Sequence, residues 1–211
     1  MTSAPGASGP ILQLLSSGLE LWVRQQCQSI VSLDIALQGS ALGLLRGRLE
    51  GVQLLARRAV FQHLPIEQVE LTSTPIRVQM GNLLKGQAVQ LDQPFAVEGH
   101  LSLSAEGLLN LLSEPRWRWL ADALGERLFG QLPLLDVRIE PDQLVFVLEG
   151  ASPSRPIELG VTPRATGGTI ELCRCDAASA LTLPMDPGIT IERAWITAGM
   201  LRLEGRARVS P

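Results

Sequence analysis

The chain contains few of the side chains that catalytic and metal sites most often use. Among its 211 residues there is no tyrosine, and there are only two histidines and three cysteines. A structural zinc site usually takes four Cys or His ligands, so Cys27, Cys173 and Cys175 would need help from the isolated His63 and His100. Three cysteines cannot form a disulfide framework, and we expect reduced thiols. The sequence predicts no metal and no cofactor.

Long apolar runs are also missing. The apolar stretch over 11–23 is interrupted by polar residues between Gln13 and Glu20, and no segment reaches the roughly 18 residues needed to span a bilayer. The first basic residue is Arg24, so the chain does not show the positively charged start of a secretory signal. We therefore expect a cytoplasmic protein that is at most peripheral to an inner or internal membrane.

Basic charge is scarce, and it is almost entirely arginine. The net charge is −3, and Lys85 is the only lysine among 18 basic residues. An acidic balance argues against a general nucleic-acid binder, and no nucleic-acid partner is predicted. A local basic cluster, formed by Arg46, Arg48, Arg57 and Arg58, fits either anionic lipid headgroups or a solvated surface.

Catalytic motifs are not found. The glycines and the lysine of segment 81–86 do not follow the order of a phosphate-binding loop, and no Gly-x-Ser-x-Gly motif occurs. The carboxylate pairs Glu67/Glu70 and Asp136/Glu140 fall on the polar faces of predicted strands. We therefore predict a protein that is not an enzyme. An enzyme acting on lipids or sugar lipids would need polar groups that converge around one of the histidines.

The hydrophobic pattern predicts one helix followed by strands. Residues 1–9 are small and polar, which is typical of a disordered terminus. From Pro10 to about Ser29 the apolar positions follow a helical period, with proline suited to the first turn. Alternation then predicts strands, beginning with Val31 to Leu37 and continuing over 66–80, 89–103, 137–148 and 189–209. The glycines between 43 and 51 indicate bends in a coiled sheet.

A second helical block interrupts the strands. Ser104 suits an N-cap, Pro115 should end one helix and start another, and Gly130 should close the block. The order of elements predicts an α+β protein with one long, strongly coiled antiparallel sheet, packed with the N-terminal helix and the helix pair over 104–129. We expect a single domain over 10–211.

The segment Pro115–Leu120 combines tryptophan with arginine. Tryptophan prefers the membrane–water interface, and arginine can reach lipid phosphates. Arg116, Arg118 and Trp119 are therefore predicted headgroup or membrane contacts. In the alternative interpretation Trp117 packs in the core, and its neighbours are ordinary surface residues.

Several segments carry a resemblance to a known family. They are residues 44–52, 66–71, 83–86, 91–95 and 103–112. Over about residues 35–150 the chain resembles the LmeA-like family of bacterial phospholipid-binding proteins. The resemblance implies a long antiparallel sheet packed with helices, an elongated apolar cleft and lipid binding at the cell envelope. The missing export signal departs from that pattern.

Together these observations predict a phospholipid or another acyl lipid as the partner, held in an apolar groove closed by both helical regions. An acyl chain of about 16 carbons loses on the order of 12 kcal/mol when it is exposed to water, so a carrier must enclose most of it. The predicted lipid-binding residues are Leu19, Trp22, Leu33, Ile35, Leu37, Leu108, Leu112, Trp117 and Leu124. The alternative is an interaction or scaffold protein that has the same fold with a filled core. The sequence does not predict an oligomeric state.

Overall fold

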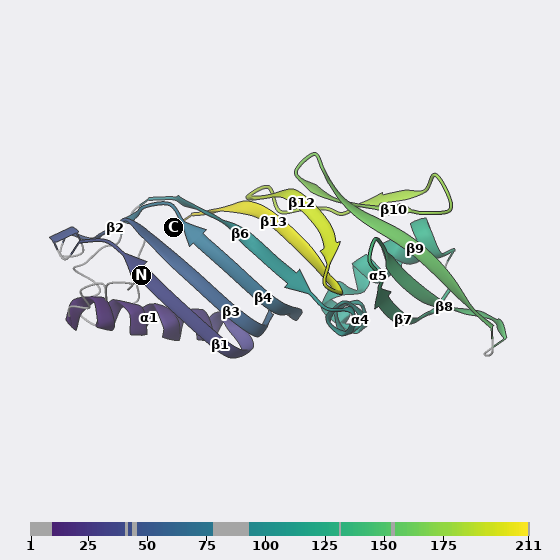
Figure 1. Cartoon of the computed structure of the whole chain (residues 1–211), viewed down its shortest axis with the longest axis horizontal. Helices are drawn as coiled ribbons and strands as arrows, with labels where there is room; N and C mark the ends of the chain where they lie inside the picture. The colour runs from purple at the N-terminus through teal and green to yellow at the C-terminus, as the bar shows by residue number, and fades with distance from the viewer. Residues whose placement is uncertain are drawn as a thin grey trace.

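The computed structural model describes residues 10–40, 42–43, 46–77, 93–130, 132–152 and 155–210. Strands make up 58% of the structure, and they form an elongated molecule with helices beside and between two antiparallel sheets (Figure 1). The α+β class is confirmed. In the part of the chain described, no helix is long and apolar enough to cross a bilayer. The predicted disordered residues 1–9 lie outside the described residues, and the single-domain assignment stays a prediction.

The first helix is shorter than its apolar pattern predicts. Helix α1 covers Pro10–Gln26, and strand β1, Cys27–Gln38, follows at once. Residues 27–30 therefore belong to the strand rather than to the helix, because pairing with β3 already begins where Cys27 lies opposite Phe61. The chain reverses direction at this junction, and α1 lies alongside the sheet (Figure 1).

The larger sheet has six strands in the order β1-β3-β4-β6-β13-β12. Its other strands are β3 (Gly51–Phe61), β4 (Leu64–Ser73), β6 (Phe95–Leu103), β12 (Ile189–Thr197) and β13 (Met200–Val209). A short ladder joins β2 (Arg48–Leu49) to β5 (Ile76–Arg77). The predicted strand residues 78–80 and 89–92, and segment 83–86 of the family resemblance, lie outside the described residues.

The second sheet has five strands in the order β11-β10-β9-β8-β7. They are β7 (Leu134–Ile139), β8 (Leu144–Ser152), β9 (Arg155–Thr166), β10 (Thr169–Arg174) and β11 (Ala180–Thr182). The Ile191 backbone N–H donates to the Gly168 carbonyl at 2.8 Å, which links β12 to the β9–β10 turn. The predicted hairpins at 141–143 and 198–199 are confirmed.

The prediction of one strongly coiled sheet is wrong. The strands divide between separate sheets, and no sheet is strongly curled. The reason is the helical block after β6: strands β7 to β11 pair with one another beyond it, and only β12 and β13 return to the first sheet. Local alternation predicts each strand but does not say which strands pair.

The helical block begins and ends as its capping residues predict. It consists of α4 (Ala105–Ser113), η1 (Pro115–Trp117), α5 (Arg118–Leu124) and η2 (Gly125–Phe129). The Ser104 hydroxyl accepts a hydrogen bond from the Gly107 N–H at 3.1 Å, which satisfies a donor that the first helical turn leaves unpaired. Gly130 closes the block with a φ of 65°, a left-handed conformation that glycine adopts without strain.

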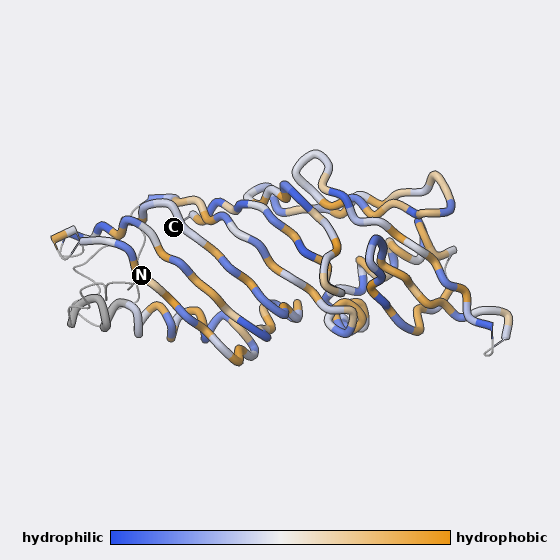
Figure 2. Tube along the Cα trace, in the orientation of Figure 1, coloured by the Kyte–Doolittle hydropathy of each residue, from blue (hydrophilic) through white to orange (hydrophobic). Residues whose placement is uncertain are grey.

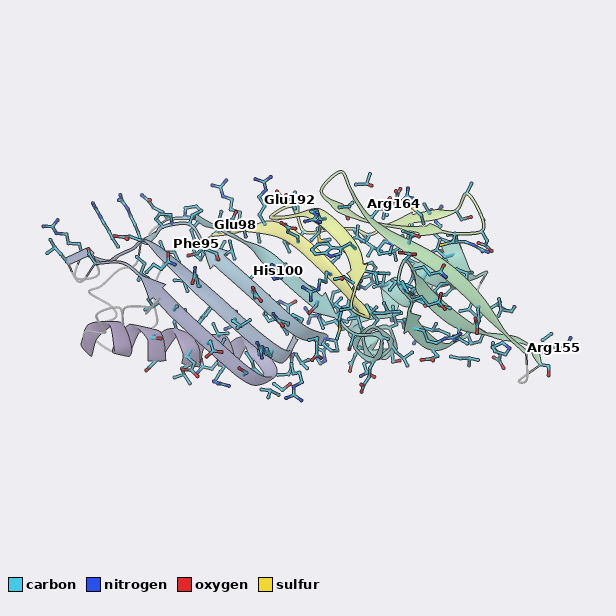
Figure 3. The ribbon with its side chains drawn as sticks, in the orientation of Figure 1. Phe95, Glu98, His100, Arg155, Arg164 and Glu192 are labelled. Atoms are coloured by element: carbon cyan, nitrogen blue, oxygen red, sulfur yellow. The ribbon has the colours of Figure 1, made fainter. Side chains whose placement is uncertain are left out.

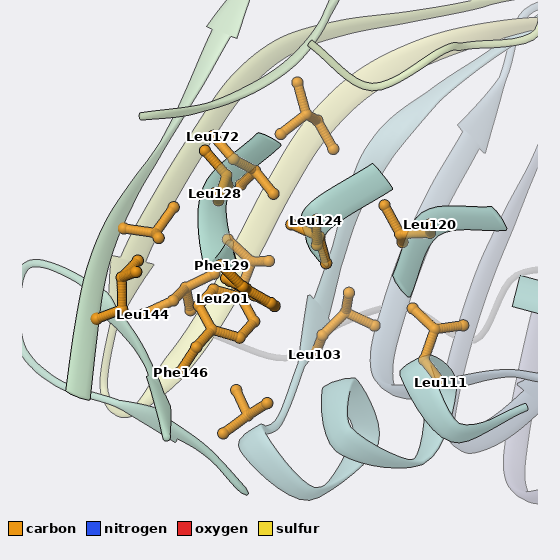
Figure 4. Close-up of a cluster of buried hydrophobic side chains, with 14 of the residues drawn as sticks. Leu103, Leu111, Leu120, Leu124, Leu128, Phe129, Leu144, Phe146, Leu172 and Leu201 are labelled. Atoms are coloured by element: carbon orange, nitrogen blue, oxygen red, sulfur yellow. The ribbon is translucent and has the colours of Figure 1, made fainter. Parts of the chain in front are cut away.

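The core lies where this block packs between the two sheets (Figure 4). Leu124, Leu128 and Leu148 are at most 2% exposed. The rings of Phe129 and Phe146 lie 4.8 Å apart with a 48° tilt, within the range of favourable aromatic pairs. The densely packed part of the molecule is therefore the helical block with the five-stranded sheet, and the α1 end of the six-stranded sheet lies outside it.

Candidate functional site: an apolar pocket on the six-stranded sheet

The two faces of the six-stranded sheet differ in polarity. Along its strands hydrophobic and hydrophilic residues alternate (Figure 2). Residues paired across an antiparallel ladder point to the same face, so the register defines rows of side chains across the sheet. One row on the apolar face is Ile35, Leu54, Leu71, Gly99, Gly205 and Ile191. The neighbouring row on the other face includes Leu55, Glu70, His100 and Glu204.

Polar side chains pair with one another across the strands of the polar face. His100 Nε2 lies 3.4 Å from Glu70 Oε2, and Arg193 Nη1 lies 3.1 Å from Glu204 Oε2. Figure 3 shows Glu98 and His100 on β6 and Glu192 on β12. The two pairs are partly exposed, and Glu98 is exposed, so this face is a solvated surface.

The apolar face carries a pocket of about 470 Å³, a volume typical of small-molecule sites. Helix α1 and strands β3, β4, β6, β12 and β13 all contribute to it. The residues that line it are mostly apolar and include Leu19, Trp22, Val23, Val52, Leu54, Val69, Leu71, Val97, Leu101, Leu203 and Ala207. Ser73 is the one small polar side chain among the lining residues of the apolar rows.

Two glycines deepen the floor of the pocket. Gly99 and Gly205 line it, and a Cβ at either position would collide with a carbonyl oxygen of a neighbouring strand. His100, Glu204 and Arg206 flank these glycines and also border the pocket, but their side chains pair on the opposite face. The floor therefore offers main chain and apolar groups rather than charge.

The rim of the pocket is also apolar. Trp22 is 52% exposed, and Phe61 and Ile189 are each 40% exposed, although all three line the pocket. Large apolar side chains gathered at the edge of a concave apolar surface are typical of a binding site rather than of an ordinary surface.

Two of the five predicted groove residues of the N-terminal region lie at this pocket. Leu19 and Trp22 line it. Leu33, Ile35 and Leu37 pair with Ala56, Leu54 and Val52 and so share the apolar face, but they are not among the lining residues. Their role in lipid binding stays a prediction.

The predicted groove residues of the helical block lie elsewhere. Leu124 belongs to the core, and Leu108, Leu112 and Trp117 pack against it. Leu112 and Leu124 also border a second cavity of about 390 Å³, near residues 132–134. The main pocket is thus bounded by α1 and not by the helical block. A role of these four residues in lipid binding stays untested, and their positions favour a packing role.

The tryptophan–arginine segment contacts the β3–β4 turn. The Trp117 indole N–H donates to the Gln62 carbonyl at 3.3 Å, and the Arg116 guanidinium donates to the Gln62 side-chain oxygen at 3.1 Å. Gln62 has a φ of 49° and the next residue, His63, a φ of 64°; such φ values are uncommon outside glycine. Arg116 and Trp117 thus hold a turn next to the rim residue Phe61. Arg118 and Trp119 are exposed, and the Trp119 ring lies 6.0 Å from that of Trp117.

The basic cluster predicted from the sequence is split by the fold. Arg46 and Arg48 lie at the β2 end of the sheet, whereas Arg57 and Arg58 lie on β3 toward its turn with β4. Strand β3 separates the two pairs, so they cannot act on one headgroup.

Cys27 and Cys173 lie in surroundings that do not activate a thiol. Within the described residues, no group of three or more His, Cys, Asp or Glu side chains could hold a metal ion. Burial raises the pKa of the Cys27 thiol, and burial together with the nearby Glu171 carboxylate raises that of Cys173. A raised pKa lowers the thiolate fraction at neutral pH and therefore the reactivity.

Sequence reasoning missed most of the pocket floor. Leu71, Val97 and Ala207 lie in segments whose alternation was recognised. The apolar positions of each alternating strand indicate which side chains face the interior. They do not indicate that these residues share one pocket, because only the pairing of β4, β6 and β13 brings them together.

Comparison with known families agrees with this architecture. A family model described as LmeA-like phospholipid-binding matches residues 6–206, nearly the whole chain. The chain therefore belongs to this family, and the resemblance is confirmed over more of its length than the segments quoted above. No curated protein and no solved structure matches it.

Proposed function

We propose that this member of the phospholipid-binding family holds a phospholipid or a similar acyl lipid in the apolar pocket, without catalysing a reaction. The observation that carries the proposal is the pocket of about 470 Å³ between α1 and the sheet, lined by apolar side chains and left open by the chain's own helices. The alternative, a scaffold protein, predicts that this space is filled by side chains of the core. The filled core of this molecule lies instead at its other end.

The size of the pocket suits one acyl chain. The volume of about 470 Å³ falls within the range of ligand pockets, and the apolar lining matches an acyl chain, for example one of about 16 carbons. Enclosing such a chain recovers on the order of 12 kcal/mol that its exposure to water would cost. A bilayer recovers about the same amount, so a lipid can pass between membrane and protein without a large change in free energy.

The polar headgroup of the lipid remains at the rim. The described pocket floor has no charged side chain to pair with a phosphate, because His100, Glu204 and Arg206, the polar neighbours of Gly99 and Gly205, pair on the opposite face. An unpaired charge in an apolar cavity would be costly. The bound lipid therefore lies with its chain inside and its headgroup in water or at a membrane surface.

Membrane contact follows from the same arrangement. Trp22, Phe61 and Ile189 surround the pocket with exposed apolar groups, which suit the boundary between headgroups and acyl chains. Arg118 and Trp119 offer a second exposed contact. We further propose, as the sequence predicts, a peripheral lipid carrier at the cytoplasmic face of an inner or internal membrane.

Filling the pocket tests the proposal. Leu71 lines the floor, and the next residue, Thr72, points to the opposite face. After incubation with phosphatidylcholine vesicles and re-isolation, native mass spectrometry should detect added phospholipid mass on the wild type and on Thr72→Trp. Leu71→Trp should carry roughly tenfold less lipid, because the indole occupies the space of the chain. A wild type without lipid, or equal lipid on both folded variants, would reject lipid binding in this pocket.

A further inference from the structure

The short β2–β5 ladder brings two arginines directly opposite each other. Arg48 pairs with Arg77, and Leu49 pairs with Ile76. The two apolar residues are each 7% exposed, whereas both arginines are exposed. Like charges that face each other across a ladder are destabilising, so the buried pair holds the arginines in an arrangement that they do not favour by themselves.

These arginines have no acidic partner in the described structure. Each of Arg24, Arg138, Arg193 and Arg206 forms an ion pair with a carboxylate. No such pair is formed by Arg46, Arg48 or Arg77 within the same described ranges. Glu50 lies in the same segment and leaves a net charge of +2 for this group. We call Arg46, Arg48 and Arg77 the cationic tip.

The cationic tip is continuous with both an exposed apolar residue and the pocket. Leu42, in the connection between β1 and β2, is 59% exposed. Ile76 lines the pocket directly beside Arg77. The β2 strand lies at the end of the elongated molecule away from the five-stranded sheet (Figure 1). An apolar side chain among arginines is typical of a segment that sits in the headgroup layer of a membrane.

We infer that the cationic tip docks the protein on an anionic phospholipid surface and thereby brings one end of the pocket to the bilayer. The planar guanidinium groups of Arg48 and Arg77 can each bind a phosphate through two hydrogen bonds. Bound phosphates would also relieve the repulsion between these two arginines. The inference deepens the proposed function by naming the surface from which lipid enters. Only the purpose of the docking, which is lipid exchange, rests on the proposed function; the docking itself does not.

Vesicle flotation at low ionic strength tests the docking. The wild type should bind vesicles of equal parts phosphatidylglycerol and phosphatidylcholine more tightly than vesicles of phosphatidylcholine alone. The double variant Arg48→Gln/Arg77→Gln should lose roughly 20-fold or more in affinity for the anionic vesicles, at about fivefold for each arginine. Added salt should remove most of the difference.

A matched control comes from the other end of the molecule. Arg155 and Arg164 lie on β9 (Figure 3), and both are exposed without an ion pair in the described structure. Arg155→Gln/Arg164→Gln changes the net charge by the same amount and should retain most of the vesicle binding. Equal losses in the two double variants, or no preference of the wild type for anionic vesicles, would overturn the inference. Tighter binding to a single-stranded oligonucleotide than to the vesicles would also overturn it.

The experiments distinguish a failure of the docking inference from a failure of the proposed lipid binding. Leu71→Trp should lose lipid mass but still bind anionic vesicles, because the cationic tip is unchanged. If the wild type binds these vesicles through the tip but never acquires lipid, the proposed function fails and the docking stands. If the Arg48/Arg77 variant acquires lipid and binds anionic vesicles as well as the wild type does, the docking fails and the proposed function stands.

Discussion

Gly99 and Gly205 lie directly opposite each other on β6 and β13, in the middle of the row that runs from Ile35 to Ile191. The Glu70 carbonyl oxygen approaches Gly99 too closely for a Cβ, and the Thr190 carbonyl oxygen does the same at Gly205. Two adjacent positions on the pocket floor therefore have no side chain. The depth of the pocket depends on the backbone as well as on the choice of apolar residues.

Replacing Gly99 should destabilise the sheet. In Gly99→Ala the added methyl group forces β4 and β6 apart, and we expect a loss on the order of 1–3 kcal/mol in the free energy of unfolding. Urea unfolding followed by circular dichroism measures this loss. Gly125→Ala is the control, because a Cβ at Gly125 meets no atom within 4 Å. Equal stability of the two variants would show that the close approach at Gly99 does not constrain the sheet.

Trp22 should report the entry of lipid. It lines the pocket and is 52% exposed, so a bound acyl chain should move its indole into an apolar environment. In a variant that retains only Trp22, made by changing Trp117, Trp119 and Trp195 to Phe, fluorescence emission should shift to the blue when vesicles are added.

A variant that retains only Trp195 serves as the comparison. This ring stacks with the Arg193 guanidinium at 4.6 Å, and its strand neighbour Ala194 lies in the row of pocket-facing Leu203, so alternation puts Trp195 on the outer face. Its emission should not change. A shift of Trp195 with an unchanged Trp22 would place the lipid on the wrong face of the sheet.

The helical block offers a test of packing against lipid binding. Leu124 is 2% exposed within the core, so Leu124→Ala should cost about 2–5 kcal/mol of unfolding free energy because it leaves a cavity. The lipid carried by each folded molecule should remain unchanged in native mass spectra. A loss of lipid without a loss of stability would instead support the original prediction that Leu124 lines the lipid site.

The Arg174–Asp176 pair should contribute to stability in a pH-dependent way. Hydrogen bonds from the Arg174 guanidinium, at 2.8 and 2.6 Å, hold the pKa of the Asp176 carboxyl below its ordinary value of 3.8. Because the folded state has the lower pKa, the pair stabilises the protein above pH 3.8 and loses this contribution as the pH falls through the folded-state pKa.

Chemical unfolding of the wild type and of Asp176→Asn at several pH values measures this contribution. The wild type should be slightly more stable at neutral pH, and the difference should disappear in acid. The effect is small because the carboxylate is exposed. A difference that persists at the lowest pH would mean that the charge of Asp176 is not its cause.

The sequence predicted the elements of the fold better than their arrangement. Ser104, Pro115 and Gly130 mark the helical block because capping and helix breaking are local effects. The pairing of β13 with β6 joins residues about 100 positions apart, as Leu201 and Leu103 show, and no local pattern encodes it. Long-range pairing also explains why the first helix ends at Gln26. The residues of its last predicted turn, from Cys27 onward, belong to β1 and pair with β3 instead.

The candidate site was predictable only in part. Leu19 and Trp22 were found because an amphipathic helix must bury one face. The apolar face of the helical block looks the same in the sequence whether it meets a lipid or a core, so the sequence could not show that Leu112 and Leu124 lie at the core and not at the main pocket. The residues of the pocket floor could be assigned to one site only after the order of the strands in the sheet was known.

Photocrosslinking tests the central claim most directly. The protein is loaded with phosphatidylcholine that carries a diazirine near the end of one acyl chain, irradiated, digested and mapped by mass spectrometry. Lipid bound as proposed should label residues of the pocket, such as Trp22, Leu71, Val97 and Ala207. Labels confined to the polar face or to the helical block, with none on β4, β6 or β13, would contradict a lipid site between α1 and the six-stranded sheet.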